Sequence, residues 1–211
     1  LSFSEKKKIF AHASEYRSDS ENGEYAAAIL KALKSQRSFE NFKRNPAYRE
    51  ILEHFSKEQG QAYLNTIQSR NDGLLSVAGD TVFLSDYVGN PFKYQFEGFS
   101  SPLSPSTLRY VKVASDLLGL FGKGLEEVAE IGCGYGGQCL VNDKLLGQRS
   151  ATLFDLPIVN KLIKRYLNST LMDGAYRTTT INEEVQCTYD LAISNCAFSE
   201  LPAVYQKVYI R

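Results

Sequence analysis

The sequence predicts an α/β protein in which a helical region precedes a doubly wound parallel sheet. In the second half of the chain, short apolar runs alternate with stretches of helical periodicity, an order typical of parallel sheets with helical crossovers. A glycine-rich turn at residues 132–137 follows the first of these runs and precedes a helical stretch. Because glycine permits close backbone approach, we expect this turn at the first strand-to-helix connection of the sheet.

Composition narrows the range of functions. The 211 residues are 43% hydrophobic, which is enough for a substantial core, and 24 basic residues balance 24 acidic ones. A chain without net charge has no overall field that would attract nucleic acid or an anionic membrane. No run approaches the roughly 20 apolar residues of a membrane span, and no apolar signal core follows the charged residues 5–8. We therefore expect a cytoplasmic protein with neither a nucleic-acid nor a membrane partner.

The cysteine and histidine pattern predicts no metal site. None of the cysteines forms a C-x-x-C pair, and both histidines lie far from them in the sequence; these residues are Cys133, Cys139, Cys187 and Cys196, and His12 and His54. A structural zinc site requires closer ligand spacing. Free cysteines are commonly buried, so we expect reduced and mostly buried thiols.

Residues 1–70 form the predicted helical region. Apolar residues recur there at intervals of three and four in two stretches, which places each set on one helix face. The two sets are Ala26, Ile29, Leu30 and Leu33, and Tyr48, Ile51, Leu52 and Phe55. Asn45 and Pro46 mark the start of the second helix, because an asparagine side chain accepts an unpaired backbone N–H and proline at the first helical position loses no hydrogen bond.

Residues 71–104 are predicted to be an irregular connecting region, since glycine and proline recur and apolar runs are short. The run from Thr81 to Leu84 is rich in β-forming residues and favours a hairpin.

Residues 105–211 form the predicted sheet domain. Ser104 and Pro105 repeat the cap-plus-proline signal, and a helix follows to near Gly122; its apolar face consists of Tyr110, Val113, Ala114 and Leu117. Helices are also expected from the glycine turn to about Leu146 and from Pro157 onward. The predicted strands cover roughly 128–131, 152–154, 176–181 and 191–194, and the fourth is apolar enough for the middle of a parallel sheet.

The glycine turn indicates a nucleoside site without identifying the cofactor. Its glycines at 132, 134 and 137 fit the G-x-G-x-x-G pattern of dinucleotide sites. Those at 132, 134 and 136 fit the G-x-G-x-G pattern of methyltransferases. Asp155 lies 18 residues after Gly137, at the end of the second predicted strand. A carboxylate there can accept hydrogen bonds from both ribose hydroxyls, and it suits NAD and S-adenosylmethionine equally.

Glu130 favours S-adenosylmethionine. It lies two residues before Gly132, at the carboxyl end of the first predicted strand. A dinucleotide would bring a pyrophosphate to this region, and a carboxylate repels it, whereas the ammonium of the methionine moiety is stabilised by a carboxylate. The alternative is that Glu130 forms only a local cap or ion pair.

Three segments resemble the class I S-adenosylmethionine-dependent methyltransferases, and most of all the sugar O-methyltransferase family. They are Glu130 to Gly137, Phe154-Asp155-Leu156-Pro157, and Ile193 to Leu201. Gly89-Asn90-Pro91 and Ser104 to Tyr110 are similar as well, so the resemblance covers roughly residues 87–205. The glycine turn is widely shared, whereas the other two segments are more specific at these spacings.

The resemblance implies a Rossmann-like methyltransferase sheet and a set of cofactor contacts. Glu130 and the backbone of the turn are expected to hold the methionine moiety. The turn residues in this set are Gly132, Cys133, Gly134, Tyr135 and Gly136. Asp155 would hold the ribose, Leu156 would pack on the adenine, and Asn182 would contact its amine. Asn195 would lie where cofactor and acceptor meet, and S-adenosylhomocysteine would be the product.

Two further residues complete the predicted site. Glu200 is the candidate base that removes the proton of the acceptor hydroxyl; its alternative role is a carboxylate favoured at a helix N-terminus. Arg109 is expected either to pair with the methionine carboxylate or to be a solvated helix charge. The expected acceptor is a sugar or a nucleotide-linked sugar, and the sequence does not predict the oligomeric state.

Two other functions remain open at this point. One is an NAD-dependent oxidoreductase, and the other is a non-catalytic binding protein on a methyltransferase scaffold. The sheet of this class normally has seven strands, whereas four are predicted. We therefore expect the C-terminal part of the domain to lie outside this sequence, the alternative being that another chain covers the fourth strand.

Overall fold

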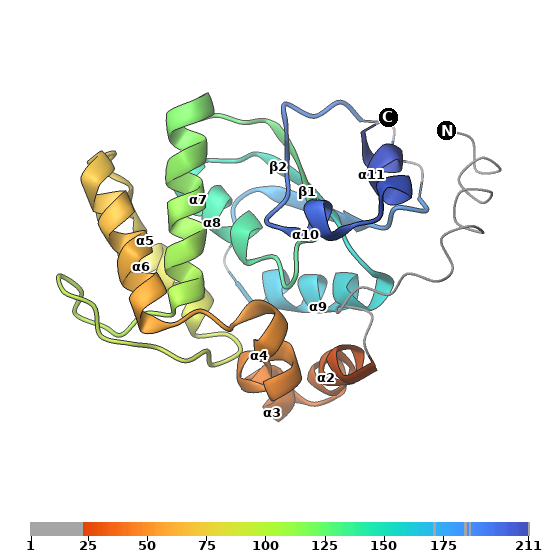
Figure 1. The fold of residues 1–211 in the computed structure, drawn as a ribbon, viewed down its shortest axis with the longest axis horizontal. Helices are drawn as coiled ribbons and strands as arrows, with labels where there is room; N and C mark the ends of the chain where they lie inside the picture. The colour runs from red at the N-terminus through yellow and green to blue at the C-terminus, as the bar shows by residue number, and fades with distance from the viewer. Residues whose placement is uncertain (1–22, 171, 184, 186, 211) are drawn as a thin grey trace.

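A computed structural model describes residues 23–170, 172–183, 185 and 187–210 (Figure 1). His12, with the rest of residues 1–22, lies outside the described part. Helices α5 and α6 stand beside the long helix α7, α8 lies between α7 and the strands, and α2 to α4 lie next to α9 (Figure 1). The protein is therefore of the α/β class, as the sequence predicts.

The N-terminal region is helical, as expected. Its elements are α2 (Gly23–Lys34), α3 (Gln36–Phe39), the 3-10 helix η2 (Phe42–Arg44), α4 (Pro46–Leu52) and α5 (Lys57–Arg70). The predicted cap of α4 is confirmed, because the side chain of Asn45 accepts a hydrogen bond from the backbone N–H of Tyr48 at 3.3 Å. A capping box between Ser56 and Gln59 starts α5, and both signals follow from side-chain oxygens that accept unpaired N–H groups.

The predicted apolar faces of the first two helices are partly wrong. Leu30 is 43% exposed, whereas Ala28 and Ala32 are buried. Helix α2 packs against α9, and Arg165 of α9 donates to the carbonyl oxygens of Ala32 and Leu33. This hydrogen bonding brings the alanine side of α2 against α9 and leaves Leu30 outside. Helix α4 ends at Leu52, so Phe55 does not extend its face.

The connecting region contains more helix than expected. Helix α6 spans Leu74–Val82 and the 3-10 helix η3 spans Phe83–Asp86, so the strand expected at 81–84 is wrong. Leu74, Ala78 and Val82 are buried at a spacing of four residues, which is helical periodicity, and α6 packs on α8. In the irregular stretch that follows, Tyr94 and Leu103 form one antiparallel bridge with two backbone hydrogen bonds of 2.9 Å.

The described sheet has four parallel strands in the order β3-β2-β1-β4. They are β1 (Glu127–Ile131), β2 (Ser150–Phe154), β3 (Ala175–Thr179) and β4 (Leu191–Ile193). All four predicted strands are confirmed, although the third ends at Thr179 rather than at 181. The fourth lies at an edge of the described sheet, and its residues are half-buried or exposed; the expectation of a central position is therefore not met in the described part of the chain.

The remaining helices are α7 (Pro105–Phe121), α8 (Gly137–Leu146), α9 (Pro157–Asn168), α10 (Ala197–Glu200) and α11 (Ala203–Tyr209). The predicted cap at Ser104 is confirmed, and α8 ends at Leu146 as expected, with Gly147 as its C-cap in the left-handed conformation. Tyr110, Ala114 and Leu117 of α7 are buried as predicted, whereas Val113 is half-buried. The predicted alternation of strand and helix fails once, because the described residues between β3 and β4 contain no helix.

Strand order places a crevice between β1 and β4. From β1 the chain moves outward through β2 to β3, and it then returns to the other side of β1 to form β4. Connections that leave neighbouring strands in opposite directions open a crevice at the carboxyl ends of those strands, which is where ligands bind in such sheets.

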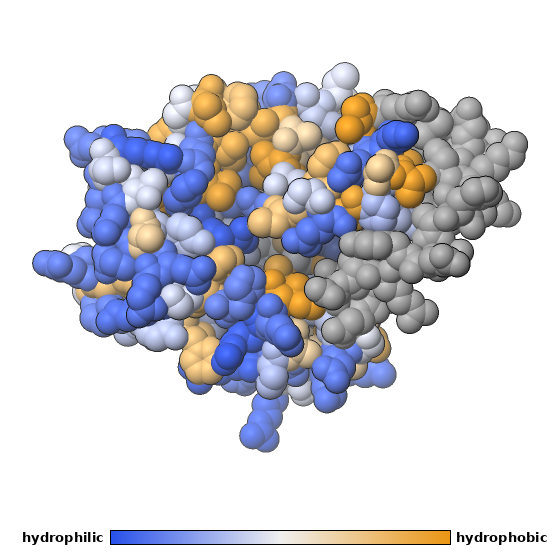
Figure 2. Space-filling view, viewed as in Figure 1, coloured by the Kyte–Doolittle hydropathy of each residue, from blue (hydrophilic) through white to orange (hydrophobic). Residues whose placement is uncertain are grey.

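Hydrophobic side chains are exposed at the carboxyl end of α7. Leu120 and Phe121 are exposed there, and hydrophobic residues gather over this end in Figure 2.

The cysteines are buried less often than expected. Cys133 and Cys139 are buried, whereas Cys187 and Cys196 are exposed, so the expectation of mostly buried thiols holds for only half of them. No helix in the described ranges is both long and apolar enough to cross a membrane.

The glycine turn yields a stability prediction. Gly132 and Gly147 both have positive φ, +73° and +66°, but a Cβ at Gly132 would overlap the Cβ of Ala197, whereas a Cβ at Gly147 meets nothing within 4 Å. We expect Gly147→Ala to lower the free energy of unfolding by about 1 kcal/mol, and Gly132→Ala to cost roughly 1–3 kcal/mol more through overpacking. Urea unfolding of both variants measures the difference, and equal losses would contradict the close contact with α10.

Candidate functional site

A cavity of about 420 Å³ opens at the carboxyl ends of the strands. Its floor includes Ile131, the last residue of β1, with Gly132 after it, and Phe154, the last residue of β2, with Asp155 after it. Its other walls come from both ends of the chain; they include Tyr25, Ile51 and Leu52 of the N-terminal helices, and Glu200, Leu201, Tyr205 and Tyr209 of the C-terminal ones. The cavity therefore occupies the crevice that the strand order creates.

The glycine turn is held in a conformation that side chains rarely adopt. Gly132, Gly134 and Gly136 have φ values of +73°, +58° and +89°, a region open mainly to glycine. A Cβ at Gly134 would lie 2.9 Å from Cδ1 of Leu52, and one at Gly136 would lie 3.3 Å from the side chain of Leu167. The glycines therefore have two structural roles. They allow the backbone angles of the turn, and they allow α4 and α9 to pack directly on it.

Asp155 connects the second strand to this turn. Its Oδ2 accepts a hydrogen bond from the backbone N–H of Gly134 at 3.0 Å, and its Oδ1 accepts one from that of Leu156 at 2.8 Å. A carboxylate can accept about four hydrogen bonds, so capacity remains on the side that lines the cavity. Burial raises the pKa of Asp155 to about 6, although the backbone N–H donors oppose this rise.

Glu130 lies beneath the turn and does not belong to the cavity wall. The residue is only 3% exposed, and no described residue donates a hydrogen bond to its side chain. Burial, and after it the charge of Asp155, raise the pKa of Glu130 to about 8, and the charge of Arg109 opposes this rise. The carboxyl group is thus mostly protonated at neutral pH, and a cation placed beside it would favour ionisation.

The predicted site residues divide into two groups. Those that line the cavity are Gly132, Gly134, Asp155, Leu156, Asn182, Asn195 and Glu200. Those that do not are Arg109, Glu130, Cys133, Tyr135 and Gly136. The side chains of Cys133 and Tyr135 are buried, because residues between the glycines point away from the cavity; Cys133 donates to the carbonyl oxygen of Glu130 at 3.1 Å.

Arg109 is half-buried and is not a solvated helix charge. Its guanidinium carbon lies 5.0 Å from the ring centroid of Phe55 and 4.9 Å from that of Tyr110. Its Nε is buried without a hydrogen-bond partner among the described residues. An unpaired buried donor is costly, and Arg109 is not among the residues that line the cavity.

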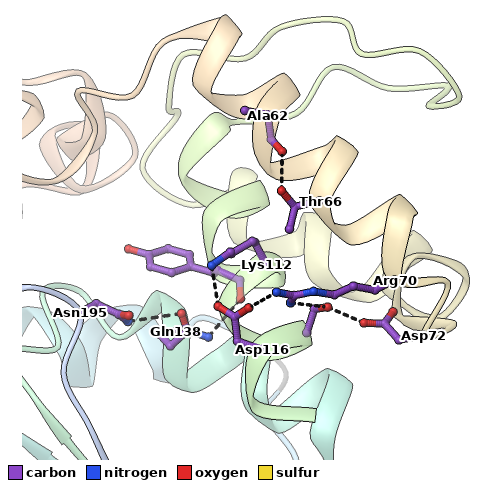
Figure 3. Close-up of polar contacts among 10 residues, drawn as sticks. Ala62, Thr66, Arg70, Asp72, Lys112, Asp116, Gln138 and Asn195 are labelled. Atoms are coloured by element: carbon purple, nitrogen blue, oxygen red, sulfur yellow. Dashed lines mark hydrogen bonds and ion pairs between the residues drawn. The ribbon is translucent and has the colours of Figure 1, made fainter. Parts of the chain in front are cut away.

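Asn195 and Glu200 enter the site from the segment after β4. Nδ2 of Asn195 donates to Oε1 of Gln138 at 3.4 Å, and Gln138 in turn donates to the carbonyl oxygen of Tyr110 (Figure 3). The next residue, Cys196, has φ +78°, a strained conformation of the kind found at functional sites. Glu200 is exposed and is the last residue of α10, two residues before Pro202, the N-cap of α11.

A set of ion pairs fixes the helix that carries Arg109. Arg70 of α5 and Lys112 of α7 both contact the carboxylate of Asp116, at 2.5 and 2.6 Å, and Arg70 also donates to Ser115 (Figure 3). Helix α5 is thereby joined to α7, and α7 packs on α8 behind the glycine turn.

Sequence reasoning missed the residues that reach the cavity from distant segments. Ile51 and Leu52 carried a helical periodicity that indicated a buried face, whereas Tyr25 was not part of a predicted face; no local signal directed any of the three to this cavity. Tyr205 and Tyr209 of α11 were likewise unmarked. Among the described residues that line the cavity there are two carboxylates, Asp155 and Glu200, and no lysine, arginine or histidine.

Comparisons with known proteins assign no family. No protein-family model matches the chain, and no curated protein matches it either. Within the described ranges, no group of three or more potential metal ligands comes together. The functional argument therefore rests on the geometry and charge of the cavity.

The raised pKa values predict that stability falls as pH rises. A carboxyl group whose pKa is higher in the folded protein binds a proton that the unfolded chain has lost, so unfolding releases it. For Glu130 the interval runs from its ordinary value of 4.5 to about 8. We expect urea unfolding to show declining stability from pH 5 to pH 8, and Glu130→Gln to reduce the slope by up to about 1.4 kcal/mol per pH unit.

The matched control is Glu126→Gln. The side chain of Glu126 is 59% exposed and pairs with Arg149, and such surface pairs contribute little. This variant should retain the wild-type slope. An unchanged slope in Glu130→Gln as well would show that the Glu130 carboxyl group titrates normally.

Proposed function

We propose that this protein is an S-adenosylmethionine-dependent O-methyltransferase with a Rossmann-like fold. The observation that carries the proposal is the acidic character of the site: Glu130 and Asp155 flank the glycine turn, and the cavity-lining residues within the described part of the chain include no cationic side chain. The proposed acceptor is a hydroxyl of a sugar or of a nucleotide-linked sugar, as the sequence resemblance suggests.

Charge supports S-adenosylmethionine over a dinucleotide. A pyrophosphate carries two negative charges and normally binds at backbone N–H groups and cations. Here the N–H of Gly134 already donates to the carboxylate of Asp155. The cofactor proposed here instead brings an ammonium and a sulfonium, which buried carboxylates stabilise.

The proposed roles of the individual residues come from the sequence resemblance, and each of these residues lines the cavity. Asp155 accepts hydrogen bonds from the ribose hydroxyls, Leu156 packs on the adenine, and Asn182 contacts its amine. The cofactor supplies an electrophilic methyl group. The protein orients the acceptor and removes its proton; Asn195 performs the first task and Glu200 accepts the proton from the acceptor hydroxyl.

Calorimetric titration tests the cofactor class. We expect S-adenosylhomocysteine to bind more tightly than NAD, and the observed enthalpy at pH 7 to vary with the ionisation enthalpy of the buffer. The second effect arises because an ammonium beside Glu130 lowers its pKa and releases a proton, and Glu130→Gln should abolish it. Tight binding of NAD with no response to S-adenosylhomocysteine would indicate an oxidoreductase. Binding without methyl transfer to any glycan would indicate the non-catalytic alternative.

Asp155→Ala tests the ribose contact. We expect a loss of S-adenosylhomocysteine affinity of roughly 10-fold to 100-fold, because hydrogen bonds to charged groups contribute about 1.5–3 kcal/mol. The control is Asp173→Ala, since the side chain of Asp173 is 84% exposed and pairs with Lys144 away from the cavity. Circular dichroism checks that both variants fold. Unchanged affinity in Asp155→Ala would remove this residue from the site.

A further inference from the structure

A fully buried lysine lies beneath the glycine turn. Lys43 of η2 is 0% exposed. Its Nζ donates a hydrogen bond to the carbonyl oxygen of Ser85 at 2.8 Å, and it lies 4.1 Å from the ring centroid of Tyr135 and 5.1 Å from that of Tyr166. The ammonium thus faces the ring of the residue between Gly134 and Gly136.

Burial of this charge is costly and needs compensation. Desolvation lowers the pKa of Lys43, and the charges of Glu53 and Asp86 oppose that effect. Both carboxylates are themselves held by hydroxyl groups, Glu53 by Ser106 at 2.8 Å and Asp86 by Thr107 at 2.6 Å. The negative face of an aromatic ring attracts a desolvated ammonium, so the ring of Tyr135 is part of this compensation.

Few side chains of the turn itself can hold it in place. Between residues 132 and 137 only Cys133 and Tyr135 have side chains, since the other four positions are glycine. The ring of Tyr135 is fully buried and packs edge-on against three aromatic rings; their centroids lie at 4.8 Å for Tyr166, 5.8 Å for Phe42 and 6.0 Å for Tyr110. The Tyr135 side chain therefore anchors the turn in the core, in addition to the hydrogen bond from the N–H of Gly134 to Asp155.

Lys43 also connects this anchor to segments far away in the sequence. Its backbone N–H donates to the carbonyl oxygen of Gly89 at 3.0 Å, and a Cβ at Gly89 would lie 2.8 Å from Cγ of Lys43. Ser85, which accepts from Nζ, also contacts Thr107 of α7 at 3.0 Å. One side chain thus brings the N-terminal region, the connecting region and α7 to the same turn.

We propose that Lys43 is a positioning residue of the cofactor site, which holds the glycine turn in its binding conformation through the ring face of Tyr135. Its effect on cofactor affinity rests on the function proposed above, whereas its effect on the turn does not. The N-terminal region is then part of the cofactor site.

Lys43→Met tests the proposal, because it keeps most of the side-chain length and removes the charge. We expect amide hydrogen exchange in residues 132–137 of the ligand-free protein to become at least 10-fold faster, with exchange in β2 unchanged. We also expect S-adenosylhomocysteine to bind at least 10-fold more weakly. Lys34→Met, at the exposed end of α2, should leave both measurements at wild-type values.

A purely structural role predicts a different pattern. Ile67→Ala removes a buried side chain of α5, and it should lower the melting temperature without changing either measurement. If Ile67→Ala weakens binding and speeds exchange in the turn as much as Lys43→Met does, or if Lys43→Met leaves both at wild-type values, the proposal is wrong. If Lys43→Met does not fold, Tyr135→Leu replaces it and carries the same expectations. Failure of the wild type to bind S-adenosylhomocysteine would refute the proposed function only, and hydrogen exchange would still decide the role of Lys43.

Discussion

Close packing of three separate chain segments on the turn at residues 132–136 depends on the absence of Cβ atoms there. Leu52 lies over Gly134, Ala197 lies against Gly132, and Leu167 packs beside Gly136. Any larger residue would push α4, α10 or α9 away from the carboxyl end of β1. The cavity exists because these segments meet at one point, and its walls therefore come from residues near 25, 52, 155 and 200.

Charge in the interior is arranged around the same turn. Glu53, Glu130 and Asp155 are buried carboxyl groups whose pKa values rise to about 7, about 8 and about 6, mainly through desolvation. Protonation reduces the cost of burying them, and a cationic ligand beside the turn would reduce it differently, by pairing with the ionised forms. Lys43 lies over the ring of Tyr135, and the charges of Glu53 and Asp86 oppose the desolvation of its ammonium. The free protein thus tolerates an excess of acidic groups that suits a positively charged ligand.

Elements with strong local signals were predicted well. Caps at Asn45 and Ser104 follow from the chemistry of one side chain and its nearest backbone N–H groups, and the strands follow from short apolar runs. Where packing overrode local pattern, prediction failed: the exposed side of α2 follows from hydrogen bonds that Arg165 makes from another helix. The β-forming residues of 81–84 became helical, since α6 packs on α8 and propensity is weaker than burial.

The α/β class, the glycine turn, and the placement of Glu130 and Asp155 at the ends of the first two strands could be predicted from local sequence, because each depends on neighbours within a few residues along the chain. The packing of distant segments was needed to establish that Glu130 lies behind the cavity wall, that Tyr25 and Leu52 line the cavity, and that Lys43 lies under Tyr135. These contacts join residues separated by dozens of positions or more. No periodicity or short motif encodes such contacts, since they arise from how whole helices pack against the sheet.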